Sequence, residues 1–176
     1  TLASSSAASD VYKRQACGAT YEANELKDPV SKLNPEIPVE IRETDHLFFR
    51  LDLLQDDLET HAASRRSTWK PNVRAMTQNW LNMGLRPRAV TRDIEWGVKI
   101  PLDDEVWGEK RVYVWFDAVQ GYLTCARIWS ERIAEESGSE SDIWRRWWMD
   151  SGNLRHIYFM GKDNIPFHTI IWPGIL

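Results

Sequence analysis

Residues 154–172 read LRHIYFMGKDNIPFHTIIW, and this stretch decides which fold class the sequence indicates. Residues 157–160 are a short apolar run of β-forming side chains, which predicts a buried strand of a parallel sheet. Gly161 ends the run, and a helix is expected to follow. That helix has residues typical of helix ends, namely Asp163, Asn164, Pro166, Pro173 and Gly174. A polar turn at the carboxyl end of a parallel strand is where α/β sheets bind ligands.

Within the expected helix, Asn164, His168 and Trp172 recur every four residues and therefore form one stripe. One interpretation is a core helix that contains a hydrogen-bonded histidine, and the spacing alone favours it. The other is a substrate stripe, with two polar side chains near the strand end and an indole one turn further on. The choice between a core helix and a substrate stripe depends on the rest of the sequence.

The chain has 176 residues, a net charge of −4 and ten tryptophans. This length allows one domain or a piece of a larger one. The negative charge argues against a general nucleic-acid-binding surface, and no apolar run is long enough to span a membrane. Cys17 and Cys125 are the two cysteines. They form no disulfide framework, which is typical of a reducing compartment such as the cytoplasm.

Residues 1–15 are interpreted as non-native. They begin with a Ser- and Ala-rich stretch, and residues 10–15, DVYKRQ, look like the translation of a sequencing-library adapter. They lack the basic and apolar regions of a signal peptide. We therefore expect a disordered segment here, genuine sequence from about Ala16, and a chain that is cut at both ends.

Residues 16–48 read as a small irregular module. Cys17 and the glycine after it look like the second half of a zinc knuckle, in which a Cys-x-x-Cys turn directs two thiolates at one metal ion. The partner position is Arg14, and one cysteine cannot hold zinc, so a free thiol is expected. Residues 39–43 alternate apolar and polar side chains and predict a half-buried strand, and residues 46–51 predict another.

Two helices are predicted next, at residues 52–63 and 71–83. Pro71 starts the second helix and Gly84 stops it. Its buried face is expected to consist of three apolar side chains, Val73, Met76 and Trp80.

Residues 88–101 crowd charged side chains around a tryptophan and a glycine, as in a loop that reaches toward a site. Arg92 could neutralise a phosphate or carboxylate there. The alternative is a surface ion pair with Asp93, which contributes little to stability.

Residues 112–116 predict an aromatic strand, followed by a helix that contains Val119 and Tyr122 and by another helix near residues 141–149. The order strand, helices, strand, helix indicates a right-handed crossover and hence an α/β, doubly wound parallel sheet. Neighbouring strand ends would then bring the second unit close to the stripe, through Trp115, Ala118 and Tyr122. Such an apolar slot suits a flexible thioether or similar aliphatic side chain.

Two long motifs, VWFDA at residues 114–118 with Gly121 and Tyr122, and FMGKDNIPFHTIIWP at residues 159–173, closely resemble methionyl-tRNA synthetases. Residues 91–93 (TRD) agree with them, as does the CGATY sequence that begins at Cys17. The resemblance covers about residues 16–176. It implies the Rossmann fold of a class I synthetase, interrupted by a zinc-bearing connective peptide. Residues 16–48 would be the tail of that peptide, and residues 49–176 the second half of the catalytic domain.

The resemblance also implies residue roles. The methionine pocket would be lined by Trp115, Ala118, Val119, Tyr122, Asn164, His168 and Trp172. Gly161 and Asp163 would hold the ribose of ATP and of the adenylate, and Arg92 would contact the substrate carboxylate or the phosphates. Methionine would be activated with ATP and Mg²⁺ and transferred to tRNA, and zinc would belong to an intact knuckle.

The sequence departs from the family in stated ways. Val119 and Gln120 stand where the family commonly has Pro-Ile, and neither His-Ile-Gly-His nor Lys-Met-Ser-Lys-Ser occurs. Because those signatures bind the triphosphate, we expect no methionine activation by these residues alone. The alternatives are a related class I synthetase for another aliphatic or sulfur amino acid, and a non-catalytic synthetase-like binding module.

Overall fold

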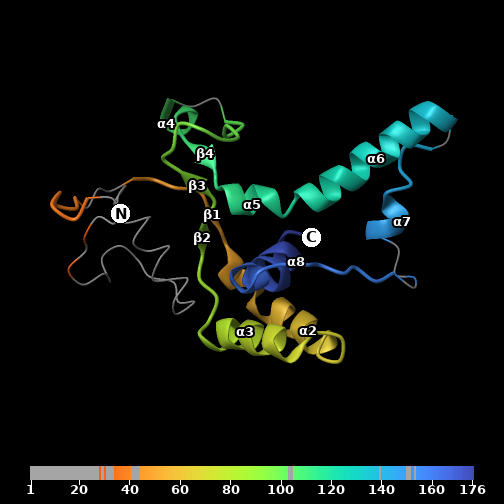
Figure 1. The fold of residues 1–176 in the computed structure, drawn as a ribbon, viewed down its shortest axis with the longest axis horizontal. Coiled ribbons are helices and arrows are strands. Elements are labelled where there is room, and N and C mark those ends of the chain that lie inside the picture. Colours follow the sequence, from red (N-terminus) through yellow and green to blue (C-terminus); the bar gives the residue numbers. More distant parts are fainter. Residues whose placement is uncertain are drawn as a thin grey trace. The chain divides into compact units, whose positions relative to one another are not determined.

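The computed structural model describes residues 28, 30, 34–40, 44–102, 105–138, 140–149, 152 and 154–176 (Figure 1). Contacts within the chain divide it into two compact units, residues 1–46 and residues 47–176, and each is described here by itself. The predictions for residues 1–15 and for Cys17 lie outside the described residues. Among the described helices, none is long and apolar enough to cross a membrane.

In the first unit, the described residues form a turn at Asn34. The amide of Ile37 donates a hydrogen bond to the Asn34 carbonyl, and the amide of Glu36 donates one to the Asn34 side chain. Such local bonding by asparagine is typical of turns. In the strand predicted at residues 39–43, residues 39 and 40 are not in a strand. Residues 41–43 lie outside the described part.

The second unit begins with a helical hairpin. A short 3₁₀ helix, η2 (Leu51–Leu54), leads into α2 (Gln55–Ser64), and α3 (Pro71–Asn82) follows. The helix predicted at residues 71–83 is confirmed to within one residue, and the one predicted at residues 52–63 is confirmed with a 3₁₀ start, since α2 begins at Gln55. Pro71 occupies the first turn of α3, and Gly84 has a φ of 76°, a left-handed conformation that glycine adopts at low cost.

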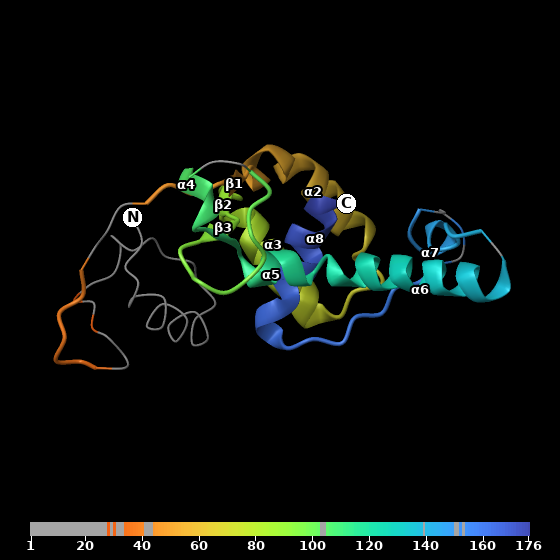
Figure 2. The same ribbon diagram turned by 90° about the horizontal axis from the view of Figure 1, so that it is seen from above.

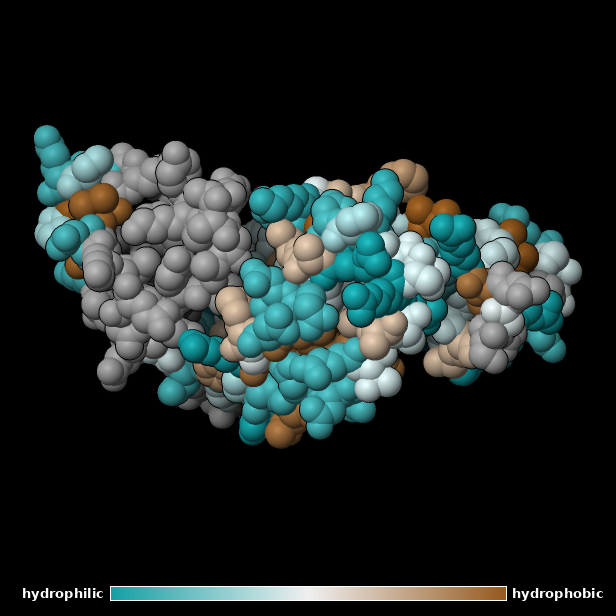
Figure 3. All heavy atoms as spheres, turned by 90° about the horizontal axis from the view of Figure 1, so that it is seen from below, coloured by the Kyte–Doolittle hydropathy of each residue, from teal (hydrophilic) through white to brown (hydrophobic). Residues whose placement is uncertain are grey.

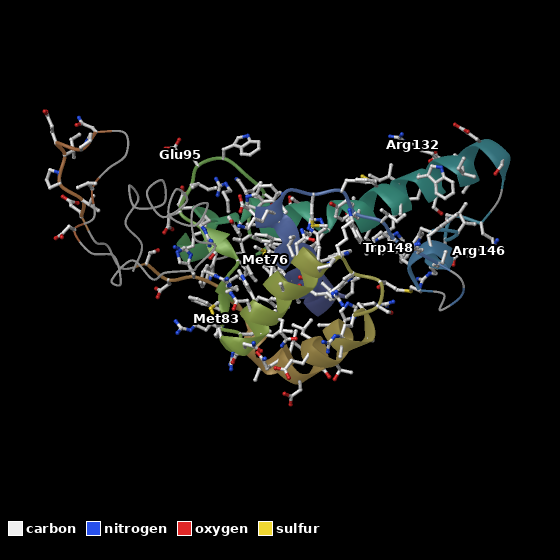
Figure 4. All side chains as sticks on the ribbon, turned by 60° about the horizontal axis from the view of Figure 1, so that its bottom comes forward. Met76, Met83, Glu95, Arg132, Arg146 and Trp148 are labelled. Atoms are coloured by element: carbon white, nitrogen blue, oxygen red, sulfur yellow. The ribbon has the colours of Figure 1, made fainter. Side chains whose placement is uncertain are left out.

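The hydrophobic core of this unit joins the hairpin to the C-terminal helices. Its buried members are Leu51, Leu58, Leu81, Leu85, Ile170 and Ile171. In α3 the buried positions are Thr77 and Leu81, while Trp80 packs against the core from its edge. Met76, which was expected on the buried face, is half-buried, and Met83 at the end of α3 is exposed (Figure 4).

A buried polar contact also connects α3 to the C-terminal helices. The Thr77 and Thr169 hydroxyl oxygens lie 2.8 Å apart. Each hydroxyl also reaches a carbonyl of its own helix, Thr77 that of Val73 and Thr169 that of Ile165. The opposite surface of the hairpin is polar, and Figure 3 shows mostly hydrophilic side chains where α2 and α3 lie.

The described strands form two small antiparallel sheets. In the first, β1 (Phe48–Phe49) pairs with β2 (Arg88–Ala89). In the second, β3 (Thr91–Arg92) pairs with β4 (Arg111–Val112). A short helix, α4 (Glu105–Gly108), lies between β3 and β4 in the sequence. Among the described strands there is thus no parallel pair, although a doubly wound parallel sheet was expected.

The strand predicted at residues 112–116 is wrong beyond its first residue. Val114–Ala118 forms the helix α5, in which the amides of Phe116 and Asp117 both donate to the Tyr113 carbonyl. β-branched and aromatic residues favour strands only where a pleated surface receives them. Here backbone hydrogen bonds to the Tyr113 carbonyl form a helical turn instead.

Helix α6 (Gly121–Ser137) follows α5 and projects from it, as Figures 1 and 2 show. The helix expected near residues 141–149 is α7 (Arg145–Trp148), shorter than expected. It lies beside the C-terminal half of α6 in both views. Ser130 of α6 is fully buried, and its hydroxyl donates to the Ser141 carbonyl, which ties the two elements together.

The strand predicted at residues 157–160 is not formed. Residues 154–160 are irregular, and no described strand pairs with them. Residues 154–156 are exposed, but over residues 157–160 the side chains alternate: Tyr158 and Met160 are half-buried, whereas Ile157 is 66% and Phe159 95% exposed. The sequence pattern of a strand is therefore present, but a strand needs a neighbour to accept its backbone hydrogen bonds.

The chain ends in three short helical segments, η3 (Lys162–Asn164), the π-helix η4 (Phe167–Ile171) and α8 (Trp172–Ile175). The expectation that Pro173 and Gly174 stop this helix is wrong, because α8 contains both. Pro173 occupies the first turn of α8, where a missing amide hydrogen is tolerated. A Cβ on Gly174 would lie 3.3–3.4 Å from the methyl carbons of Leu54 and Leu51, so the glycine allows close packing on η2.

Candidate functional site

The centre of the candidate site is a hydrogen-bonded pair, Tyr122 and His168. Tyr122 lies in the first turn of α6, and His168 lies in the π-helix η4, a type of helix that often occurs at functional sites. Tyr122 Oη and His168 Nε2 are 2.8 Å apart, and His168 Nδ1 is 2.8 Å from the Asn164 carbonyl oxygen. The predicted four-residue spacing thus brings the His168 ring to the backbone carbonyl of Asn164.

These two contacts define the tautomer of the neutral imidazole. A carbonyl oxygen can only accept, so His168 Nδ1 carries the hydrogen. Nε2 then accepts, and the Tyr122 hydroxyl donates to it. Because its hydrogen is used in this bond, the Tyr122 hydroxyl can only accept a hydrogen bond from a ligand. A ligand group that itself needs a hydrogen-bond donor is therefore disfavoured beside it.

Aromatic rings from α5 approach the same helix. The Trp115 ring lies 6.0 Å from the Phe167 ring, and the Tyr113 ring lies 6.4 Å from it. Trp115 is 44% exposed, so part of its face remains available. It therefore contacts the residue before His168, and α5 lies against η4 as the proposed slot requires.

Trp172 closes another side of the site. It is 2% exposed, and its ring meets the Trp148 ring edge-on at 5.7 Å. Its indole nitrogen is buried, and the indole is a hydrogen-bonding neighbour of the Tyr158 phenol.

Tyr158 lies between these groups. Burial raises the pKa of its phenol above the ordinary value, the nearby Trp172 side chain opposes that rise, and Tyr122 adds to it. The phenol therefore remains neutral, which keeps the surroundings of the Tyr122–His168 pair uncharged.

Two further residues from the predicted pocket lie at the end of α5. Val119 is the C-cap of α5 and is 3% exposed, so its side chain belongs to the buried interior. Ala118 is exposed. A small side chain here leaves room beside Trp115.

The expected nucleotide end lies just before this stripe. Gly161 has an extended backbone and is exposed, and its carbonyl accepts from the Asn164 amide at 3.1 Å. Asp163 is exposed in η3. Both therefore lie on the surface within one turn of Asn164, on the same segment as His168.

Arg92 is placed differently from the other predicted residues. Its guanidinium donates to the carbonyls of Ala89 and Thr91 and lies 4.1 Å from the centre of the Tyr113 ring. Tyr113 in turn contacts Phe167, so Arg92 is one ring removed from the helix that carries His168. Asp93, the alternative partner of Arg92, forms an ion pair with Lys110 at 2.6 Å.

Sequence reasoning did not single out three residues that the structure places here: Trp148, His156 and Tyr158. The signal that could have found the last two is the two-residue alternation of residues 154–160, which puts His156 and Tyr158 on one face. Trp148 points from α7 toward the body of this unit, whereas Arg146 points away (Figure 4).

No metal site is found in the described part of the chain, where no three His, Cys, Asp or Glu side chains cluster. A hollow of about 280 Å³ lies at α7, lined by Ile143, Arg146, Trp147 and Leu154. It is open and apolar, and it contains none of the residues expected to bind substrate.

Comparison with known proteins gives a consistent result. The family model described as tRNA synthetases class I (M) matches residues 2–176. A methionine–tRNA ligase of Thermoplasma acidophilum is 50% identical over 160 residues, which are 91% of this chain and 27% of that protein. A methionine–tRNA ligase of Roseiflexus sp. is 48% identical over 165 residues, with the same two coverages.

Solved structures agree. The methionyl-tRNA synthetase of Mycobacterium tuberculosis bound by methionyl-adenylate matches with a TM-score of 0.58 and 27% identity, over 82% of this chain and 26% of that one. The chain thus spans about a quarter of the length of the relatives that it matches. The fold is that of a class I tRNA synthetase, and the chain belongs to the methionine group of that family.

Proposed function

We propose that this chain forms the methionine- and adenylate-binding part of a cytoplasmic methionine–tRNA ligase, whose complete form uses ATP with Mg²⁺ and acts on tRNA. The observation that carries the proposal is the Tyr122–His168 pair. It is a hydrogen-bonded unit among aromatic rings, which suits a side chain without charge or strong hydrogen-bonding groups. A thioether also interacts favourably with aromatic rings.

Each residue then has a role that follows from its chemistry. The methionine side chain would lie among Trp115, Ala118, Val119, Tyr122, Asn164, His168 and Trp172. Asp163 would accept hydrogen bonds from the two ribose hydroxyls, and Gly161 would let the nucleotide approach the backbone. Arg92 would stabilise negative charge on the carboxylate or phosphates.

The proposed reaction has two steps. A methionine carboxylate oxygen attacks the α-phosphorus of ATP, and the bond to pyrophosphate breaks. A hydroxyl of the terminal tRNA ribose then attacks the adenylate carbonyl, and AMP leaves. Positioning and charge stabilisation supply such catalysis, so no side-chain nucleophile is needed.

The finer architecture belongs to the same proposal. Residues 157–160 would be a strand of the parallel sheet in the complete protein, which fits their alternating exposure. Cys17 would be a zinc ligand only in an intact knuckle, with a cysteine at the position of Arg14.

The test uses a chimera in which the matching residues of this chain replace those of the Thermoplasma acidophilum ligase. In ATP–pyrophosphate exchange, His168→Ala and Trp115→Ala should raise the KM for methionine about tenfold, since each removes a pocket contact. The KM for ATP should stay within about twofold.

Trp129→Ala is the matched control. Trp129 is 45% exposed, as Trp115 is 44% exposed, but lies further along α6 and should leave both constants unchanged. Equal effects of His168→Ala on methionine and ATP would contradict the assignment. Efficient exchange with leucine or cysteine in place of methionine would favour a different amino acid.

A further inference from the structure

A connected group of aromatic rings surrounds the Tyr122–His168 pair, and Tyr158 lies at its centre. The Tyr158 ring is 5.1 Å from the Tyr122 ring, at an interplanar angle of 67°, and 5.3 Å from the His168 ring, at 58°. The first is an edge-to-face arrangement, which aromatic rings prefer over face-to-face stacking, and the second is tilted. Tyr158 therefore touches both members of the pair from one side.

The segment that carries Tyr158 is itself attached to α7. His156 Nε2 lies 2.7 Å from the Trp147 carbonyl oxygen, and the His156 ring lies 4.6 Å from the Trp148 ring. Because the carbonyl accepts, the neutral imidazole of His156 carries its hydrogen on Nε2. Its Nδ1 is then an acceptor facing the Tyr158 hydroxyl, 3.5 Å away.

Trp148 completes the group, because it contacts both His156 and Trp172. Rings from α6, α7, residues 154–160 and the C-terminal helices thus meet at one place. None of the three residues added here was assigned to the pocket: Tyr158 and His156 come from the irregular segment, and Trp148 comes from α7.

We propose that Tyr158 is a positioning residue, which holds the Tyr122 and His168 side chains in their hydrogen-bonded arrangement, while His156 and Trp148 hold Tyr158 and Trp172 in place. The proposal rests on the proposed function for its consequence, since the held pair would face methionine. Tyr158 touches the pair, and it acts through that pair rather than on substrate.

The ring of Tyr158, and not its hydroxyl, supplies the contacts with Tyr122 and His168. Tyr158→Phe should therefore preserve the arrangement of this pair, and Tyr158→Ala should let the two side chains move apart. Phe159→Ala is the matched control, because Phe159 is the next residue and is 95% exposed. Far-UV circular dichroism identifies variants that fail to fold, and Tyr158→Leu replaces the ring with an apolar side chain if the alanine variant does not fold.

The first measurement concerns the pair alone. Ring-nitrogen NMR spectra of the 176-residue chain, with His168 assigned through His168→Asn, report the imidazole tautomer. The chain has four histidines, so assignment is direct. The unaltered chain, Tyr158→Phe and Phe159→Ala should show the Nδ1–H tautomer of His168. Tyr158→Ala or Tyr158→Leu should shift the His168 Nε2 signal, because the hydrogen bond from Tyr122 is lost, and an unchanged Nε2 signal in the folded ring-less variant would overturn the proposal.

The second measurement is titration of the same chains with methionine, followed by tryptophan fluorescence. Loss of the ring should raise the apparent Kd about five- to tenfold, whereas Tyr158→Phe should stay within about twofold. An unaltered chain whose fluorescence does not respond to millimolar methionine would count against the proposed function. The tautomer measurement would still decide the role of Tyr158.

Discussion

At the scale of single residues, the centre of the site is a set of histidine and tyrosine side chains that hydrogen-bond in an aromatic setting. His168 and His156 have opposite tautomers in their neutral forms, because the carbonyl of Asn164 faces Nδ1 in one and that of Trp147 faces Nε2 in the other. In each case the remaining nitrogen accepts from a tyrosine hydroxyl or faces one. His168 is thus an acceptor at Nε2, and His156 is an acceptor at Nδ1.

His61 gives a prediction about pH at this scale. Its pKa is lowered, first by burial and second by the positive charge of Arg65. The unfolded chain therefore binds a proton more readily than the folded chain. The contribution of His61 to the free energy of unfolding is therefore present above a pH of about 6.5 and is lost as the pH drops below that value.

When the pH is lowered from 7.5 to 5.5, we expect the urea concentration at the midpoint of unfolding to decrease in the unaltered chain and to decrease less in His61→Gln. The carboxylates titrate alike in both chains, so the difference between the two isolates His61. An identical fall in both chains would contradict this prediction.

At the scale of elements, the sequence predicted correctly those helices that are determined by residues close together in the chain. Helices α2 and α3 follow from apolar spacing, from Pro71 at a first turn and from Gly84 after a last turn. The strand at residues 112–116 failed because helical hydrogen bonds to Tyr113 replaced it. The strand at residues 157–160 failed because its bonding partners are not local in the sequence.

The site shows the same division. The contact between Asn164 and His168 follows from a four-residue spacing, and its approach to Tyr122 was predicted from the order of the elements. Tyr158 and Trp148 were missed because their contacts join segments that no short periodicity relates. The position of Arg92, bound to two carbonyls of its own strand region, could not be read from its charge.

The Thr77–Thr169 contact gives a prediction for the connection between α3 and η4. Replacing either threonine by valine should cost about 1 kcal/mol, because it removes a buried hydrogen bond. The double variant should cost less than the sum, by about 0.5 kcal/mol or more, since no polar partner remains. Chemical denaturation measures all four free energies.

Thr124→Val is the control for this cycle. Thr124 also bonds a carbonyl of its own helix, that of Gln120, but it is exposed. Its replacement should change stability by less than about 0.5 kcal/mol. Strict additivity of the two buried changes would show that the threonines act independently.

At the scale of the whole molecule, the residues that would bind methionine are present, and the two triphosphate-binding signatures are not among the 176 residues. We therefore expect no methionine-dependent ATP–pyrophosphate exchange by this chain alone. The chimera with the Thermoplasma acidophilum ligase serves as the positive control. Clear turnover by the isolated chain would contradict the need for those signatures.

The alternating exposure of residues 157–160 has a consequence for how this chain behaves in solution. The side chains of Ile157 and Phe159 are exposed beside backbone groups that no described strand pairs. Unpaired backbone groups of this kind can pair with the same groups of a second copy. Association at high concentration will therefore depend on this short segment as well as on the net charge of −4.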